Sequence, residues 1–111
     1  MNRGFFIKMS NGDVEGFKDL AFDFFSDTRR LMTGWGALLA AGSYGRLRDE
    51  LHRCKGGASL FGLEKMVGMI SECEIPLALE INGFNLDAFE REITRSEEMI
   101  GNIHSEEFAV G

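Results

Sequence analysis

Apolar and polar residues recur along most of the chain with the period of an α-helix. In the first such segment, residues 13–41, apolar side chains return every three to four positions and charged side chains, Lys18 among them, fill the opposite face. A stripe of this kind is typical of an amphipathic helix with one buried side. It consists of Val14, Phe17, Leu20, Ala21, Phe24, Phe25, Thr28, Leu31, Met32, Trp35, Leu38 and Leu39. The pattern predicts one long helix over 13–41, with Phe22 pointing away from the stripe.

Similar stripes predict three further helices, over about 43–61, 63–81 and 85–103. Gly42, Gly62 and Asn82-Gly83 separate them, and glycine and asparagine are common where helices end. Pro76 is expected to kink or end the third helix. Because short connections favour antiparallel neighbours, we expect an all-α fold, an antiparallel up-down four-helix bundle. Residues 1–111 then form a single domain, and the N-terminal segment around Phe6 caps one end.

Charge and targeting narrow the class of protein. The 12 basic and 18 acidic residues give a net charge of −6, and no basic stripe is present, so we expect no nucleic-acid partner. No apolar run approaches the roughly 18 residues that span a membrane, and the first residues lack the pattern of a signal peptide. We therefore expect a cytoplasmic monomer without a membrane partner.

The two cysteines, Cys54 and Cys73, fall on apolar stripes. We interpret them as buried thiols. Together with His52 and His104 they match no spacing typical of a zinc site, so no metal is expected.

The 14 glycines are roughly twice the ordinary share, although glycine inside a helix costs about 1 kcal/mol relative to alanine. Helix ends explain some of them. Close helix packing is the interpretation for Gly34, Gly36 and Gly57. The sequence offers no reason for Gly16, Gly45, Gly68 and Gly101.

One histidine of the second predicted helix lies on its solvent face. With 100° per residue, His52 is roughly 130° from the centre of the apolar stripe. Its neighbours one and two turns away are Arg48, Asp49, Lys55, Gly56 and Ser59. Imidazole is a nucleophile near neutral pH, and a cation one turn away can stabilise phosphoryl oxygens. Two plainer interpretations stay open: a solvated histidine with basic neighbours, and a helix break at Gly56-Gly57.

A longer motif surrounds this histidine. It reads Leu51-His52-Arg53-Cys54-Lys55-Gly56-Gly57-Ala58-Ser59-Leu60-Phe61-Gly62. The run resembles the signature of histidine-containing phosphotransfer (HPt) domains, and it is most similar to the phosphotransfer domain of chemotaxis-type histidine kinases. The family is a four-helix bundle with its histidine midway along the second bundle helix. Cys54, where the family usually has leucine or isoleucine, and Pro76 depart from the family pattern.

The resemblance implies roles for individual residues. His52 is the residue phosphorylated, on Nε2, Lys55 lies near the phosphoryl group, and Gly56 clears a docking surface. Arg48, Ser59 and Leu60 complete the expected partner-docking residues. In chemotaxis-type domains a glutamate of the third helix holds the other ring nitrogen, which fixes the tautomer that can attack. Its place here is Glu74, for which an ordinary charge at a helix edge is an equal alternative.

The resemblance also implies partners. HPt domains exchange phosphoryl groups with a response-regulator receiver domain, or with a hybrid histidine kinase, and the Mg²⁺ of that step belongs to the receiver. The chain has no phosphate-binding Gly-x-x-x-x-Gly-Lys loop. We therefore expect a phosphoryl carrier without cofactor, ATP binding or kinase activity. The alternatives are a non-catalytic module that docks through Phe22 and Leu60, and a fragment of a chemotaxis-type kinase.

Overall fold

The computed structural model describes residues 2–74 and 85–103, and the regular structure in these ranges is α-helical. The prediction of an all-α fold is confirmed. The helices are α1 (Arg3–Met9), α2 (Val14–Met32), α3 (Trp35–Ala41), α4 (Tyr44–Leu60), α5 (Glu64–Glu74) and α6 (Leu86–Gly101). The expected continuation of the third helix to residue 81, Pro76, Asn82-Gly83 and His104 lie outside the described residues.

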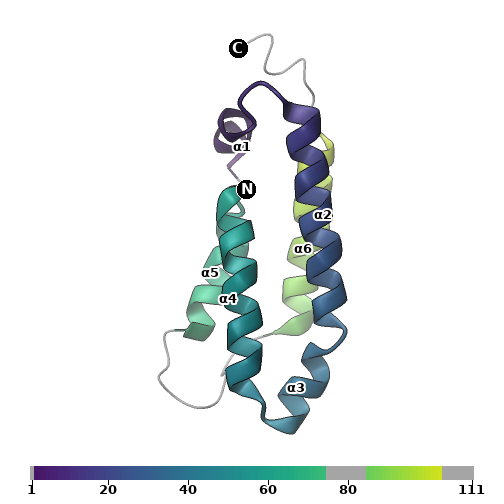
Figure 1. Ribbon diagram of the computed structural model, residues 1–111, viewed down its shortest axis with the longest axis vertical. Coiled ribbons are helices and arrows are strands. Elements are labelled where there is room, and N and C mark those ends of the chain that lie inside the picture. The colour runs from purple at the N-terminus through teal and green to yellow at the C-terminus, as the bar shows by residue number, and fades with distance from the viewer. Residues whose placement is uncertain (1, 75–84, 104–111) are drawn as a thin grey trace.

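The four longer helices run side by side, each antiparallel to the one before it (Figure 1). Contacts join α2 to α4, α4 to α5, α5 to α6 and α6 back to α2. The short helix α1 lies across one end of this group, and α3 lies at the opposite end, where it contacts α4 (Figure 1). Among the described helices none is both long and apolar enough to cross a membrane.

The prediction of one helix over 13–41 is wrong, because the helix is interrupted between α2 and α3. The amide of Thr33 donates to the carbonyl of Arg30 over 3.3 Å, and that of Gly34 to the carbonyl of Leu31 over 3.1 Å. Each of these hydrogen bonds reaches three residues back along the chain instead of four, so a 3₁₀ turn replaces the α-helical pattern. The interpretation of Gly36 as a packing position is also wrong, since a Cβ there would meet nothing within 4 Å. Gly34 marks the break and not a helix contact.

The break brings Trp35 into the core. Its side chain is fully buried, its ring lies 5.7 Å from that of Phe89, and its Nε1 donates to Glu50 Oε1 over 3.2 Å. In a continuous helix the position of Trp35 in the sequence would fix the direction of its side chain. Because the helix axis changes at Thr33-Gly34, the indole can point in a direction that the axis of α2 would not allow. Burial of this large ring with its N–H satisfied is a sufficient physical reason for the break.

The interior is one cluster of buried apolar side chains from all the described helices. At the α1 end it contains aromatic rings packed at a tilt to one another: the ring centres of Phe6 and Phe17 are 4.8 Å apart, and those of Phe17 and Phe61 are 5.0 Å apart. Phe6 is fully buried. Burial of this side chain fixes α1 to the end of the helices.

Four positions on α2 differ from the expected stripe. Leu20 is 56% exposed and Leu31 is 39% exposed, because the apolar stripe is wider than the surface that α2 buries. Phe22, expected off the stripe, is half-buried against the core. Lys18, expected in solvent, is only 8% exposed, and its ammonium group donates to the carbonyl of Ile103 over 2.8 Å. A cation is stabilised there by the unpaired carbonyls at the end of α6.

Candidate functional site

Helix α4 holds His52 on a firmly anchored backbone. The helix begins after Gly42, which ends α3 with a φ of +72°, and it is followed by Gly62, with a φ of +70°. Its buried face consists of Leu47, Leu51, Cys54 and Ala58. His52 directly follows the buried Leu51 and is exposed. The imidazole is therefore in reach of solvent while the backbone behind it is held by the core.

The residues expected around His52 share its side of α4. At 100° per residue, Arg48, Lys55, Gly56 and Ser59 fall within about 60° of His52. Gly56 and Ser59 are exposed, and Arg48 and Lys55 are half-buried. We call these five residues the His52 face.

Leu60 lies at the edge of the His52 face, about 80° around the helix from His52, and is 44% exposed. Gly57 lies further around the helix than Leu60 in the same direction and touches Phe24 of α2. This direction around α4, from His52 through Leu60 to Gly57, therefore leads toward α2. Leu60 thus places an apolar side chain between the histidine and α2.

The two adjacent glycines of α4 have different surroundings. A Cβ at Gly57 would lie 2.5 Å from Phe24 Cε1 and 2.6 Å from Phe24 Cδ1, whereas a Cβ at Gly56 would meet nothing within 4 Å. Gly57 is thus a packing position, as predicted. Helix α4 runs unbroken through both residues, so the interpretation of a helix break is wrong. Gly56 leaves the surface beside His52 open.

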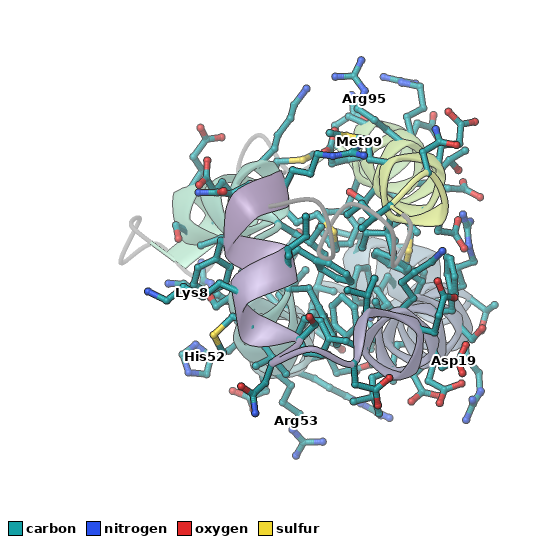
Figure 2. All side chains as sticks on the ribbon, turned by 90° about the horizontal axis from the view of Figure 1, so that it is seen from above. Lys8, Asp19, His52, Arg53, Arg95 and Met99 are labelled. Atoms are coloured by element: carbon teal, nitrogen blue, oxygen red, sulfur yellow. The ribbon has the colours of Figure 1, made fainter. Side chains whose placement is uncertain are left out.

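Two basic side chains, Arg48 and Lys55, and one acidic side chain, Asp49, lie within about 60° of His52 around α4. Helix α4 contains four basic and two acidic residues, in a chain with a net charge of −6. Lys8 of α1 projects to the same side of the molecule as His52 (Figure 2). This side therefore suits a negatively charged group or partner.

The remaining expected site residue is Glu74. It is the last residue of α5, and its side chain lies outside the described residues. Helices α4 and α5 are in contact. The role of Glu74 in orienting the imidazole stays a prediction.

The cysteines are buried, as expected, with Cys54 4% and Cys73 3% exposed. Burial raises the pKa of the Cys54 thiol; a hydrogen bond with Thr28 lowers this pKa, and the charge of Glu50 raises it. The Sγ of Cys54 lies 3.9 Å from Thr28 Oγ1. Such a thiol stays protonated and is a poor nucleophile or metal ligand. In the described ranges no three histidine, cysteine or acidic side chains are grouped to hold a metal ion.

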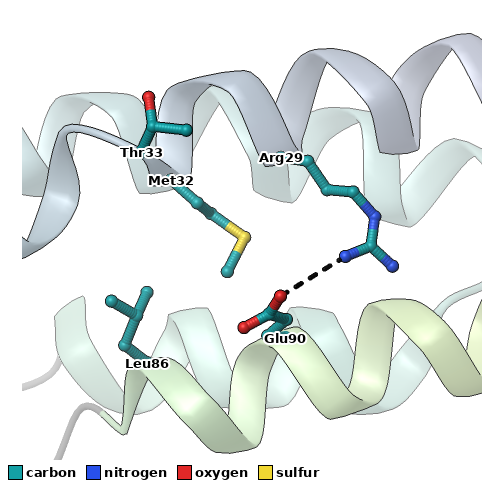
Figure 3. A pocket seen from close by; sticks show the side chains of 5 residues that line it. All are labelled: Arg29, Met32, Thr33, Leu86 and Glu90. Carbon is teal, nitrogen blue, oxygen red and sulfur yellow. Dashed lines mark ion pairs between the residues drawn. The ribbon is translucent and has the colours of Figure 1, made fainter.

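A second candidate is a pocket of about 360 Å³ between α2 and α6, lined by Arg29, Met32, Thr33, Leu86 and Glu90 (Figure 3). Arg29 donates to Thr94 Oγ1 over 3.1 Å, lies 3.7 Å from Glu90 and is hydrogen-bonded to Glu97. Glu97 is thus part of an ion-pair cluster between α2 and α6. Two carboxylates already neutralise the guanidinium, so this pocket offers little to an anionic ligand.

These contacts could not be predicted from the sequence because Arg29 and Glu97 belong to helices far apart in the chain.

Comparison of the chain with protein-family models, with curated proteins and with solved structures found no match. The functional interpretation therefore depends on the residues of the chain and their geometry.

Proposed function

We propose that the chain is a histidine-containing phosphotransfer domain that accepts a phosphoryl group on His52 and relays it in a multistep phosphorelay. The observation that supports this most is the exposed histidine in the middle of α4, with Lys55 and the open Gly56 one turn further along. The closed series of contacts from α2 through α4, α5 and α6 back to α2 supports the four-helix bundle that this family has. The partner is a receiver domain or a hybrid histidine kinase, in the cytoplasm.

The proposed reaction exchanges one bond to phosphorus for another. The lone pair on Nε2 of His52 attacks the phosphorus of an aspartyl phosphate. The bond between phosphorus and the aspartate oxygen breaks, its electron pair returns to the carboxylate, and Nδ1 keeps its proton. The reverse step discharges the phosphohistidine onto another aspartate.

Within this reaction the protein supplies position and charge. Phosphoryl transfer depends chiefly on alignment and on stabilisation of the phosphoryl oxygens. Lys55, one turn from His52, provides the positive charge. The receiver provides the aspartate and its Mg²⁺, so the chain acts as a carrier without kinase activity or a cofactor of its own.

Labelling tests the proposal directly. The protein is incubated with a radiolabelled phospho-receiver, and the wild type is expected to acquire phosphate that is labile to acid and stable to alkali. His52→Gln should abolish the label. His104→Gln is the matched control, because these are the 2 histidines of the chain, and it should retain the label. Equal labelling of wild type and His52→Gln refutes the proposal.

Lys55 has its own test. Because it lies outside the buried face of α4, Lys55→Ala should slow the transfer and leave the melting temperature nearly unchanged. A large fall in melting temperature contradicts the proposed role, since it shows that Lys55 serves the fold.

The second candidate function is a docking module that binds a receiver without accepting phosphate. The exposure of Leu60, at 44%, favours it. Phe22, the other residue expected to dock, packs against the core instead. This candidate predicts that wild type and His52→Gln bind the receiver equally and that neither is labelled.

A further inference from the structure

A hollow of about 310 Å³ lies between α1, the end of α4 and the start of α5. Phe5 of α1, Ser59 and Gly62 at the end of α4, and Val67 of α5 line it. Phe5 is 36% exposed, although it is a large apolar side chain. The hollow therefore has space for an apolar group, with apolar walls from two helices that are far apart in the sequence.

The hollow opens on the side of the molecule that contains His52. Ser59 belongs both to its lining and to the His52 face. It lies two helical turns from His52, about 10 Å along α4 at 1.5 Å per residue. A stable protein interface covers about 800 Å² on each partner, a patch with a radius of roughly 16 Å. A protein centred on His52 thus covers the hollow as well.

Helix α1 is fixed in place before any partner binds. Phe6 is fully buried, the amide of Asn2 donates to the carbonyl of Gly62 over 3.0 Å, and Arg3 donates to the carbonyl of Asn102 over 3.4 Å. A Cβ at Gly62 would lie 2.8 Å from Phe5 Cδ1, so Gly62 allows Phe5 to approach closely. A wall that is ordered in advance costs the partner little entropy on binding.

We infer that this hollow receives an apolar side chain of the receiver domain that docks over His52, so that α1 helps to select the partner. The inference rests on the proposed function. A receiver that presents an aspartyl phosphate is negatively charged where it meets His52. Arg48 and Lys55 of the His52 face and Lys8 of α1 on the same side complement that charge and outnumber the acidic Asp49 of α4 and Glu64 of the hollow (Figure 2). An apolar anchor beside a charged contact matches the usual composition of protein interfaces.

Kinetics of transfer from the phosphorylated receiver test the inference. Phe5→Ala removes one wall of the hollow, and Met9→Ala, also on α1 and 41% exposed, is the matched control outside the lining. Loss of an interface anchor typically changes affinity by about tenfold. We expect Phe5→Ala to raise KM for the receiver about tenfold with kcat nearly unchanged, and Met9→Ala to leave KM as in the wild type.

A second variant and a small donor keep the outcomes separate. Val67→Gln makes the opposite wall polar and should also raise KM, even if Phe5→Ala fails to fold. Labelling with phosphoramidate, which needs no docked partner, reports whether His52 is intact in each variant. Unchanged KM in folded Phe5→Ala or Val67→Gln overturns the inference. Absence of any label on wild-type His52 overturns the proposed function instead.

The same hollow could be covered by a second copy of the chain. Sedimentation of the wild type tests this, since a dimer that Phe5→Ala dissociates overturns the inference in favour of self-association. A monomer under the conditions of the transfer assay, together with the rise in KM, supports a receiver as the occupant.

Discussion

Alanine at each of the two adjacent glycines of α4 is expected to change stability in different directions. At Gly56 a methyl group meets nothing within 4 Å, so Gly56→Ala adds helix propensity without a clash. Glycine in a helix interior costs about 0.5–1 kcal/mol relative to alanine. The free energy of unfolding should rise by about that amount.

At Gly57 the same gain in propensity is opposed by the ring of Phe24. The new methyl group would lie 2.5 Å from Phe24 Cε1, so the ring has to move. Phe24 also packs on Phe25 at 5.5 Å and on Phe61 at 5.7 Å between ring centres. Overpacking of this kind costs about 1–3 kcal/mol. Gly57→Ala should therefore be about 1–3 kcal/mol less stable than Gly56→Ala.

Urea denaturation followed by circular dichroism measures both variants against the wild type, with a shared m-value as the check on two-state unfolding. For a domain of this size 1 kcal/mol corresponds to about 4 °C or more in melting temperature. Equal stability of the two variants refutes the packing of Phe24 on Gly57. A loss of stability in Gly56→Ala refutes the open surface beside His52.

The same pair of variants separates stability from transfer. If His52 accepts a phosphoryl group as proposed, Gly56→Ala should slow transfer from the receiver while it stabilises the protein, because the methyl group would stand in the proposed path of the receiver to His52. A variant that is more stable and transfers as fast as the wild type would show that Gly56 is not needed for docking.

Two other perturbations test the burial of unexpected groups. Lys18→Met removes charged hydrogen bonds to the carbonyls of Gly101, the last residue of α6, and of Ile103 just beyond it. Urea denaturation should show a free energy of unfolding lower by about 1.5–3 kcal/mol, whereas Lys8→Met, at an exposed position, should change it by less than about 0.5 kcal/mol. Equal losses in the two variants contradict the buried contact. Burial raises the pKa of the Cys54 thiol, so at pH 8 less of this thiol is ionised in the folded protein than in the unfolded chain. In the variant Cys73→Ser, iodoacetamide should therefore label Cys54 much more slowly in buffer than in urea, as measured by mass spectrometry. Equal rates in the two solvents refute the burial.

The boundaries of α4 and α6 could be predicted from the sequence to within one or two residues. Strong local signals mark these ends: Gly42 and Gly62 adopt positive φ, and the side chain of Asn85 accepts a hydrogen bond from the amide of Ala88. The break between α2 and α3 has no such signal, because it depends on how Trp35 packs between distant segments. Local propensity predicts helix ends well only where local contacts decide them.

In the candidate site, too, the features set by local sequence could be predicted and those set by distant contacts could not. Its solvent-facing side follows from the angle between His52 and the buried stripe of one helix, which the sequence contains. The wall formed by Phe5 and the burial of Lys18 do not follow, since each needs contacts across more than fifty positions of the chain. Among the four glycines that the sequence left without a reason, Gly16 alone has a local one: the side chain of Asp13 accepts a hydrogen bond from its amide, and a Cβ at Gly16 would lie 2.3 Å from Asp13 Oδ2.

The two glycines of α4 also differ in what their missing side chains do for the fold around the exposed His52. Together they lower the helix propensity of one turn by about 2 kcal/mol, and that turn adjoins His52. At Gly57 the missing side chain lets Phe24 of α2 lie directly against the α4 backbone, and the contact offsets part of the loss on the buried side. At Gly56 nothing in the protein offsets it. Gly45 of α4 and Gly68 of α5 are equally open, so an uncompensated glycine does not by itself indicate a partner. What supports the proposed docking is the position of the open Gly56 one turn from the exposed His52.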